Sequence, residues 1–338
     1  MRAVVVRSGR LVVEDVPAPK PGPGQVVIRV RACAICGSDL HALAAGWLPD
    51  GAILGHEFAG EVAEVGEGVV NLASGDRVTS FPVMPCGSCA ACRSGATANC
   101  THGTTIGLGS AQGGLAEDVL SHASVVYRLP DALPFDVAAA CEPLTVALYA
   151  VHDSGIRCGE TAAVLGAGPI GLFVLQCLRV AGVADIRVIE PNPARRALAQ
   201  RLGATAVYDP RADDPRAAIL EATVVGPDVV FDCAGAPGTL QTAAELVRRG
   251  GVVQLVGVNM GEEQIVALPW ILREIEVRGS LGGRREFPQA LQLLAEGRVD
   301  VAAMTTRIVD LDSVPETFAA LARHDTTDAF VVVRPAEA

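Results

Sequence analysis

The chain has 338 residues, half of them hydrophobic, and a formal net charge of −11 at pH 7. This length exceeds a single typical core, so two domains are expected. The acidic balance argues against nucleic acid or an anionic membrane surface as a partner, and neither is expected. Met1–Arg7 contains too short an apolar run for a signal peptide, which makes the cytoplasm the expected location.

Residues 1–80 alternate short apolar runs with turns that are rich in glycine and proline. This punctuation predicts closely spaced strands and a β-barrel-like domain. The predicted strands are Arg2–Val6, Leu11–Val16, Gln25–Ala34, Gly60–Val65 and Asp76–Ser80.

Three potential metal ligands, Cys36, His56 and Glu57, fall within this region. A thiolate, an imidazole and a carboxylate are ligands that zinc takes, so together they predict a metal site. Taken singly, Cys36 fits a small buried hydrophobic residue and His56 fits a hydrogen-bonded core histidine. Cys33 and Cys36 also form a C-x-x-C pair, but no thioredoxin-like βαβ pattern surrounds them.

A second group of potential ligands follows at close spacing, as C-x2-C-x2-C-x7-C. Four thiolates on one short loop can close a tetrahedral shell, which is typical of a structural zinc site. An iron–sulfur cluster is the rival interpretation, but the Cys-Pro that follows such clusters is missing. The four cysteines are Cys86, Cys89, Cys92 and Cys100.

Strands are predicted to begin at Gly113 and to cover Val125–Leu129, and a helical pattern then opens at Cys141 and runs to Val151. Either Glu142 or Cys141 completes the first metal site, and periodicity does not decide between them. Glu142 is also explained as a first-turn acid that the helix dipole favours.

An apolar run, Ala162–Leu165, leads into three glycines spaced G-x-G-x-x-G and then into a helical pattern. This is the order of a dinucleotide-binding unit, in which the glycines allow a tight turn and the phosphates sit at the helix start. A second apolar run ends on Glu190, which is placed to bind the ribose hydroxyls. The residues expected to contact the cofactor are Gly166, Gly168, Pro169, Ile170, Gly171, Glu190, Arg195 and Val256.

Two other interpretations of this stretch are weaker. Ala162–Val183 is long and apolar enough to suggest a membrane span, but it contains a proline, an arginine and four glycines. The carboxylate of Glu190 would repel a 2′-phosphate, so NAD is favoured over NADP. Arg195 and Arg196, just beyond it, are the features that point to NADP.

Strands and helices alternate after this turn, which predicts a parallel, doubly wound sheet. Two more helical patterns and a closing strand complete the chain. The further predicted strands are Val229–Asp232, Val252–Gly257, Ile275–Arg278 and Phe330–Val333, and the helices are Arg195–Arg201, Leu240–Arg249, Pro288–Glu296 and Val314–Arg323.

The chain resembles the zinc-containing medium-chain alcohol and polyol dehydrogenases along essentially its whole length. The matching blocks are Cys36–His41, Gly55–Glu57, the four cysteines, Glu142–Leu144, and the glycine turn with Glu190. The resemblance implies a GroES-like β-barrel catalytic domain and a Rossmann domain that binds NAD. The implied bounds are 1–150 for the catalytic domain with its zinc lobe at about 82–102, 151–284 for the Rossmann domain, and 285–338 for the returning segment.

The same resemblance implies roles for individual residues. Cys36 and His56 are ligands of a catalytic zinc, and Glu57 is a ligand or a close acid that exchanges with bound water. Glu142 matches the further ligand of the sorbitol- and threonine-dehydrogenase-like branch, whereas ethanol-type members have a cysteine there, for which Cys141 is the candidate. Ser38 matches the hydroxyl that takes the substrate proton, and His41 the relay at the ribose.

The expected function is NAD-dependent oxidation of a secondary alcohol, namely a polyol, sugar alcohol or amino-alcohol, with one catalytic and one structural zinc per chain. The alternatives are a primary or aromatic alcohol dehydrogenase that uses Cys141, and a zinc-binding module without turnover. The resemblance also implies a homodimer or homotetramer joined near Val252–Val258 and Ile265–Leu268.

Overall fold

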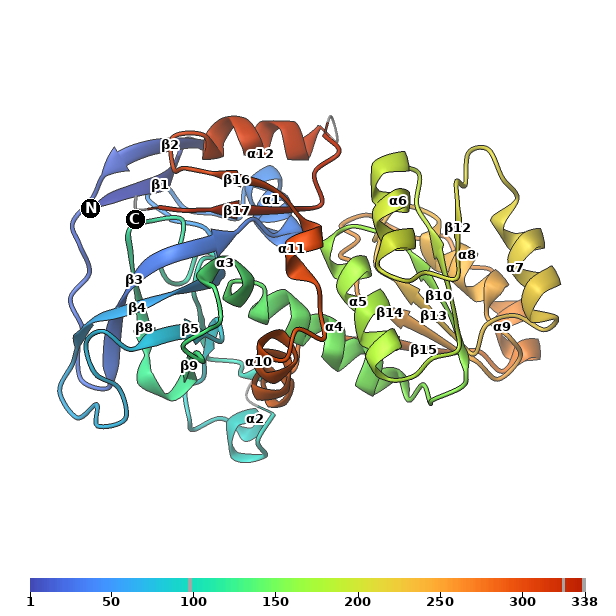
Figure 1. Cartoon of the computed structure of the whole chain (residues 1–338), viewed down its shortest axis with the longest axis horizontal. Helices are drawn as coiled ribbons and strands as arrows, with labels where there is room; N and C mark the ends of the chain where they lie inside the picture. The colour runs from blue at the N-terminus through green and yellow to red at the C-terminus, as the bar shows by residue number, and fades with distance from the viewer. Residues whose placement is uncertain (97–98, 324–325, 336–338) are drawn as a thin grey trace. The chain divides into compact units, whose positions relative to one another are not determined.

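The computed structural model describes residues 1–96, 99–323 and 326–335 (Figure 1). The chain forms two compact units. Unit 1 comprises Met1–Glu142, Phe287–Gly297 and Thr305–Ala338, and unit 2 comprises Pro143–Glu286 and Arg298–Met304. Positions 97–98 of the expected zinc lobe, and 324–325 and 336–338 of the expected returning segment, lie outside the described residues.

Unit 1 is built on a mainly antiparallel sheet in the order β16-β17-β3-β4-β5-β9, with β8 also paired to β3. The closing strand β17 joins β3, so the last part of the chain returns to the first domain. These strands are β3 Gln25–Ala34, β4 Glu57–Val65, β5 Arg77–Ser80, β8 Asp118–His122, β9 Val126–Arg128, β16 Thr305–Val309 and β17 Phe330–Val333. The interior packs around large side chains such as Ile28, Phe58 and Leu115.

Smaller elements complete unit 1. Two hairpin-like pairs stand beside the main sheet, β1 with β2 and β6 with β7. Helix α12 packs on β2 and lies close to α1 (Figure 1). The bounds are β1 Arg2–Arg7, β2 Arg10–Asp15, β6 Val83–Met84, β7 Thr104–Thr105, α1 Gly37–Ala44, α2 Ala90–Arg93, η2 Ala123–Val125, α3 Phe135–Ala138, α10 Phe287–Ala295 and α12 Val314–Ala322.

Unit 2 contains a fully parallel sheet in the order β12-β11-β10-β13-β14-β15. Its strands are β10 Thr161–Leu165, β11 Asp185–Ile189, β12 Ala206–Tyr208, β13 Val229–Asp232, β14 Val252–Leu255 and β15 Glu276–Gly279. The strand order reverses at β10, which continues to β11 on one side and to β13 on the other. Ligands of such sheets bind at the carboxyl ends of the strands around this point.

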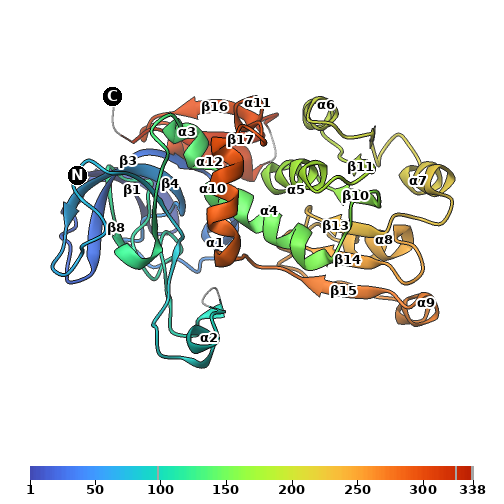
Figure 2. The ribbon, with the colours of Figure 1, turned by 60° about the horizontal axis from the view of Figure 1, so that its bottom comes forward.

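Helices cover both faces of the parallel sheet. Figure 2 shows α5 and α6 on one face and α8 and α9 on the other. The helices of this unit are α4 Cys141–Ser154, whose first two residues belong to unit 1, α5 Pro169–Val180, α6 Pro193–Arg201, α7 Pro215–Thr223, α8 Thr239–Leu246, α9 Ala267–Arg273, η3 Arg284–Glu286 and α11 Val301–Met304. The expected doubly wound sheet and the expected β-rich catalytic domain are therefore confirmed.

The run Ala162–Val183 divides into β10, a glycine turn and α5. Within the described ranges, no helix combines the length and the apolar character that crossing a membrane requires.

Candidate active site and metal sites

Cys36 is placed by the corner between β3 and α1. It is the N-cap of α1, with extended backbone angles of φ −90° and ψ 151°. The Cys36 N–H donates to Oδ2 of Asp39 at 3.1 Å, and the Asp39 side chain is fully buried. This reciprocal cap fixes the helix start, and the Cys36 thiol is held beside it.

His56 and Glu57 lie on the neighbouring chain segment, where β4 begins opposite the end of β3. Ala34 pairs with Glu57 across the two strands. Gly55 turns the chain into β4 with φ +95°, and a Cβ there would come within 2.8 Å of Cys33 Sγ. In the part of the chain that the structure describes, the ligand atoms of Cys36, His56 and Glu57 all lie within 4.8 Å of one another.

Asp39 also orients the His56 ring. Nδ1 of His56 lies 3.3 Å from Oδ1 of Asp39, and only 4% of the His56 surface is exposed. Nε2 lies 3.2 Å from Ser38 Oγ, which in turn lies 3.2 Å from Cys36 Sγ. A carboxylate on one ring nitrogen leaves the other for a metal, which is the arrangement that histidine ligands adopt in metalloproteins.

Burial and crowded acids shift the pKa values of this cluster. Burial, with the nearby charge of Glu57, raises the pKa of the Cys36 thiol to about 11. Burial also raises the pKa of Glu57 to about 8, and the charges of Glu142 and Asp39 add to that rise. For His56, burial lowers the pKa, but the charges of Asp39 and Cys36 and the hydrogen bonds with them together outweigh burial, and the pKa rises well above its ordinary value.

These shifts describe a buried set of acidic groups that a divalent cation would stabilise in their charged forms. Among the described residues, no hydrogen-bond donor reaches Oε2 of Glu57, which is buried. Such an orphaned oxygen, together with a thiol and an imidazole, fits a zinc ion.

Glu142 and Cys141 occupy the first turn of α4 and differ in what they contact. Cys141 is fully buried, and its thiol donates to the carbonyl oxygen of Phe287 at 3.8 Å. Glu142 is half-buried, and burial raises its own pKa while the charge of His56 opposes that rise. The Glu142 carboxylate is therefore electrostatically coupled to the cluster.

Ser38 and His41 stand on α1, three residues apart and thus on one face of the helix. Ser38 is half-buried beside the thiol and the imidazole, whereas His41 is exposed. The structure thus brings Ser38 into the cluster and leaves His41 toward solvent.

The four cysteines of the lobe converge at the surface of unit 1 around α2. Cys89 Sγ lies 3.4 Å from Cys92 Sγ and 3.7 Å from Cys100 Sγ, and Cys86 Sγ lies 3.9 Å from Cys92 Sγ. Hydrogen bonds from the Ser88 and Cys89 backbone lower the pKa of Cys86 to about 5. Four converging sulfurs, of which those of Cys86 and Cys89 have a lowered thiol pKa, fit a closed tetrahedral zinc site.

In unit 2, the glycine turn has the geometry that close approach of phosphates requires. Gly166 has φ +89°, and a Cβ on Gly171 would lie 2.0 Å from the Gly166 carbonyl oxygen, so α5 begins tightly against the turn. Gly168 is the N-cap of α5 and has open space where a Cβ would be. Pro169, which has no N–H, and Ile170 form the first turn, and the Ile170 N–H precedes the first helical hydrogen bond, from the Leu172 N–H to the Gly168 carbonyl oxygen.

Glu190 follows β11 directly and is 5% exposed. Oε2 of Glu190 accepts from the Ala167 N–H and Oε1 accepts from the Asn192 N–H, both at 2.7 Å. The carboxylate therefore links the glycine turn to the start of α6, where Arg195 lies in the first turn.

Val256, which was also expected at the cofactor, lies at the end of β14. Its N–H donates to the Asp232 carbonyl oxygen at 2.9 Å, at the carboxyl edge of the sheet.

The sequence did not reveal the role of Asp39, although this residue stands inside the Cys36–His41 block. An acid three residues after the N-cap was an available signal for a helix cap, but nothing local indicated its contact with His56. The ion pairs around Asp209, described below, were also missed.

Parts of the chain match two domain families of known proteins. Residues 22–131 match the alcohol dehydrogenase GroES-like domain, and residues 169–296 match the zinc-binding dehydrogenase domain. The (R,R)-butanediol dehydrogenase of Bacillus subtilis is 36% identical to this chain over 348 aligned residues that cover 96% of each protein. The sorbitol dehydrogenase of the same organism is 33% identical and covers 94% of this chain and 92% of its own length.

A zinc-binding dehydrogenase from Sinorhizobium meliloti, whose crystal structure contains NADP, superposes with a TM-score of 0.93. It is 35% identical to this chain, and the alignment covers 99% of both.

The closed cysteine set gives a first testable expectation. Cys92→Ser removes one of four thiolates, so the protein should retain about one zinc per chain instead of two and should unfold at a lower temperature. Metal content by atomic emission and thermal unfolding by circular dichroism would measure both effects.

Cys158→Ser is the matched control, because Cys158 is an exposed free cysteine outside both sets. Full zinc content in Cys92→Ser would show that this cysteine is not a ligand.

Proposed function

Because this chain belongs to the zinc-containing medium-chain alcohol and polyol dehydrogenases, we propose that it oxidises the secondary alcohol of a vicinal diol or polyol with NAD, and reduces the matching ketone in reverse. The observation that carries this is the cluster of the half-buried Cys36 with the buried His56 and Glu57, and the Ser38 hydroxyl beside it. The relatives that act on butanediol and sorbitol support the diol and polyol class.

Cys36, His56 and one or both of Glu57 and Glu142 would hold the catalytic zinc, and Cys86, Cys89, Cys92 and Cys100 would hold the structural zinc. When bound, zinc supplies a Lewis acid for the alcohol oxygen and NAD supplies the hydride acceptor. The Asp39 carboxylate keeps the His56 ring in one orientation through its charge, with Oδ1 at 3.3 Å from Nδ1, which leaves Nε2 for the site.

Ser38 is proposed to take the proton from the substrate hydroxyl. Its Oγ lies 3.2 Å from both Cys36 Sγ and His56 Nε2, so a hydroxyl bound at this cluster is within reach. His41 lies one helical turn further and is exposed, so its imidazole can pass the proton to solvent.

Glu142 is the proposed further ligand, in preference to Cys141. The Cys141 thiol is engaged with the Phe287 carbonyl, whereas the Glu142 charge contributes to the raised pKa of Glu57. The Glu142 carboxylate is close enough to shift the pKa of Glu57, so it is better placed than the Cys141 thiol to bind the same metal ion.

This choice is testable by replacing each neighbour in turn. Glu142→Ala should weaken retention of the catalytic zinc and lower kcat/KM for 2,3-butanediol by about tenfold to hundredfold. Cys141→Ala should retain zinc and activity, because its buried thiol donates to the Phe287 carbonyl oxygen. The opposite pattern, with Cys141→Ala impaired and Glu142→Ala intact, would assign the ligand to Cys141.

The proposed substrate class is tested by NADH formation with the zinc-loaded protein. Butanediol, sorbitol, xylitol, inositols and threonine should be compared with ethanol and benzyl alcohol, with NADP in parallel. Turnover of a vicinal diol, polyol or amino-alcohol is the expected result. Turnover limited to ethanol or benzyl alcohol would favour the primary or aromatic alternative, and NAD binding without any turnover would favour a module without catalysis.

NAD is the proposed cofactor because Glu190 ends the strand that follows the glycine turn. An acid at the end of this strand binds the ribose hydroxyls in dinucleotide-binding folds, and a carboxylate there repels a 2′-phosphate; Glu190 is buried and accepts the Ala167 N–H.

We also infer that the chain forms a homodimer or homotetramer through unit 2. In the described residues, β15 pairs with β14 alone and leaves the outer edge of the sheet open. The segment around this edge carries many large apolar side chains that are at least about a third exposed. They are Val258, Met260, Ile265, Val266, Leu268, Ile271, Leu272, Val277 and Leu281.

A charge placed on this face should separate the subunits. Ile271 is 71% exposed, and Ile271→Glu should lower the mass in solution to that of a monomer, measured by light scattering. Val70→Glu serves as the control, because Val70 is 95% exposed but lies in unit 1. A monomeric wild type, or an oligomer that tolerates Ile271→Glu, would contradict this interface.

A reducing compartment, the cytoplasm, is the proposed location, because the ten cysteines within the described ranges are free of disulfides. Recovery of the native protein from an exported fraction would contradict it.

A further inference from the structure

The strand order of the parallel sheet brings three chain segments to one corner. β11 lies between β10 and β12, so the end of β11 is flanked by the glycine turn on one side and by the end of β12 on the other. The Gly166 N–H donates to the Ile189 carbonyl oxygen at 2.8 Å, and the Glu190 N–H donates to the Tyr208 carbonyl oxygen at 3.0 Å. Asp209, the residue after β12, is therefore a spatial neighbour of Glu190.

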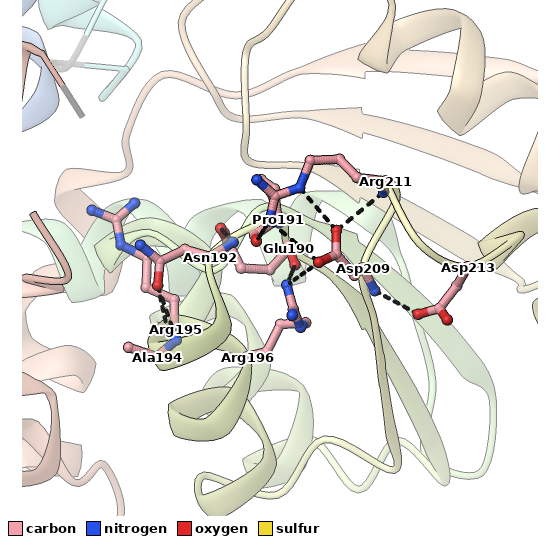
Figure 3. A network of polar contacts seen from close by, with 9 residues as sticks. All are labelled: Glu190, Pro191, Asn192, Ala194, Arg195, Arg196, Asp209, Arg211 and Asp213. Atoms are coloured by element: carbon pink, nitrogen blue, oxygen red, sulfur yellow. Dashed lines mark hydrogen bonds and ion pairs between the residues drawn. The ribbon is translucent and has the colours of Figure 1, made fainter. Parts of the chain in front are cut away.

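Asp209 holds two arginines at this corner (Figure 3). Nη1 of Arg196 lies 3.1 Å from Asp209 Oδ2, and Nε of Arg211 lies 3.1 Å from Asp209 Oδ1. The side chains of Asp209 and Arg196 are 16% and 19% exposed, so their pair is partly shielded from water. Hydrogen bonds from Arg211 lower the pKa of Asp209, which keeps its carboxylate charged.

The same two arginines reach the backbone at the end of β11. Arg196 Nη1 donates to the Glu190 carbonyl oxygen at 2.7 Å, and Arg211 donates to the Pro191 carbonyl oxygen. Figure 3 shows both guanidinium groups gathered around Glu190, Pro191 and Asp209. They lie next to the carboxylate that faces the ribose, which is where arginines that bind a 2′-phosphate are found in dinucleotide-binding folds.

The Glu190 carboxylate is fixed differently. Both of its oxygens accept backbone N–H groups, from Ala167 and Asn192, and neither contacts Arg196 or Arg211 in the bonds described above. The charges of Arg196 and Arg211 are thus balanced mainly by Asp209. Without the Asp209 charge, Arg196 and Arg211 would lose this shared ion-pair partner, and the corner would gain one net positive charge.

We propose that Asp209 is a specificity-determining positioning residue, which selects NAD over NADP by holding Arg196 and Arg211 in ion pairs and away from a 2′-phosphate. This inference rests on the proposed use of NAD, and it adds a second acidic determinant, from the neighbouring strand, to Glu190. Guanidinium groups bind phosphate strongly through bidentate hydrogen bonds. Arg196 and Arg211, once released from Asp209, could therefore bind the 2′-phosphate of NADP.

The test uses two probes that differ only in the 2′-phosphate. ADP-ribose and 2′-phospho-ADP-ribose are titrated calorimetrically into the zinc-loaded full chain, wild type and Asp209→Asn. Asp209→Asn should tighten binding of the phosphorylated probe by about tenfold, the scale of one charge-assisted contact, and change ADP-ribose affinity by less than about threefold.

Two further variants separate a specific effect from a general one. Asp213→Asn is the matched control, because it removes one negative charge from the same segment. Asp213 accepts the Asp209 N–H at 2.8 Å and is not one of the ion-pair partners of Arg196 or Arg211 described above. It should leave the ratio of the two affinities unchanged within about twofold. Adding Arg196→Ala to Asp209→Asn should abolish most of the gain for the phosphorylated probe.

The outcomes are distinguishable. An unchanged affinity ratio in Asp209→Asn, or an equal gain in Asp213→Asn, would overturn the role of Asp209 while leaving NAD binding intact. Failure of the wild type to bind ADP-ribose would overturn the proposed cofactor itself, and this inference with it. A wild type that prefers the phosphorylated probe would show that the arginines are already available, which also overturns the proposal.

Discussion

The buried carboxylate of Asp39 joins the parts of the candidate active site. One of its oxygens caps the turn that places Cys36, and the other faces the His56 ring at the start of the neighbouring strand. Leaving a fully buried carboxylate without such partners would lower the free energy of unfolding by about 3 kcal/mol or more. The β3–α1 corner and the start of β4 are therefore held together by the same charge that sets the orientation of the imidazole.

Unit 2 shows the same principle with a different carboxylate. Glu190 ties the glycine turn to the start of α6 through two backbone N–H groups, so the turn and the acid proposed to bind the ribose are fixed to each other. The next strand then adds Asp209, with its arginines, to this arrangement. The cofactor corner thus consists of an inner acid fixed by backbone groups and an outer acid fixed by side chains.

Local patterns in the sequence were enough to predict most elements and the two groups of potential ligands that the fold brings together, because cysteine spacing and glycine turns are short-range signals. β12 has only three residues and α9 exposes much of its apolar surface, so neither gave a clear periodic pattern. The distinction between Cys141 and Glu142 depends on a contact with Phe287, which is 146 residues away in the chain. The Asp209 ion pairs depend on strand order, which no single segment encodes.

The two metal sites differ in how far apart their ligands lie along the chain. The four cysteines of the lobe fall between Cys86 and Cys100, so bringing them together closes only short loops and costs little chain entropy. The candidate active-site ligands are drawn from Cys36, the start of β4 and the start of α4, and they meet only once the barrel has formed. We therefore expect the lobe to be able to bind its metal before the rest of the chain has folded, whereas we expect the catalytic metal to bind only to the folded unit 1. A shortage of zinc would then prevent the lobe from binding zinc during synthesis, and it would prevent the active site from binding zinc after the chain has folded.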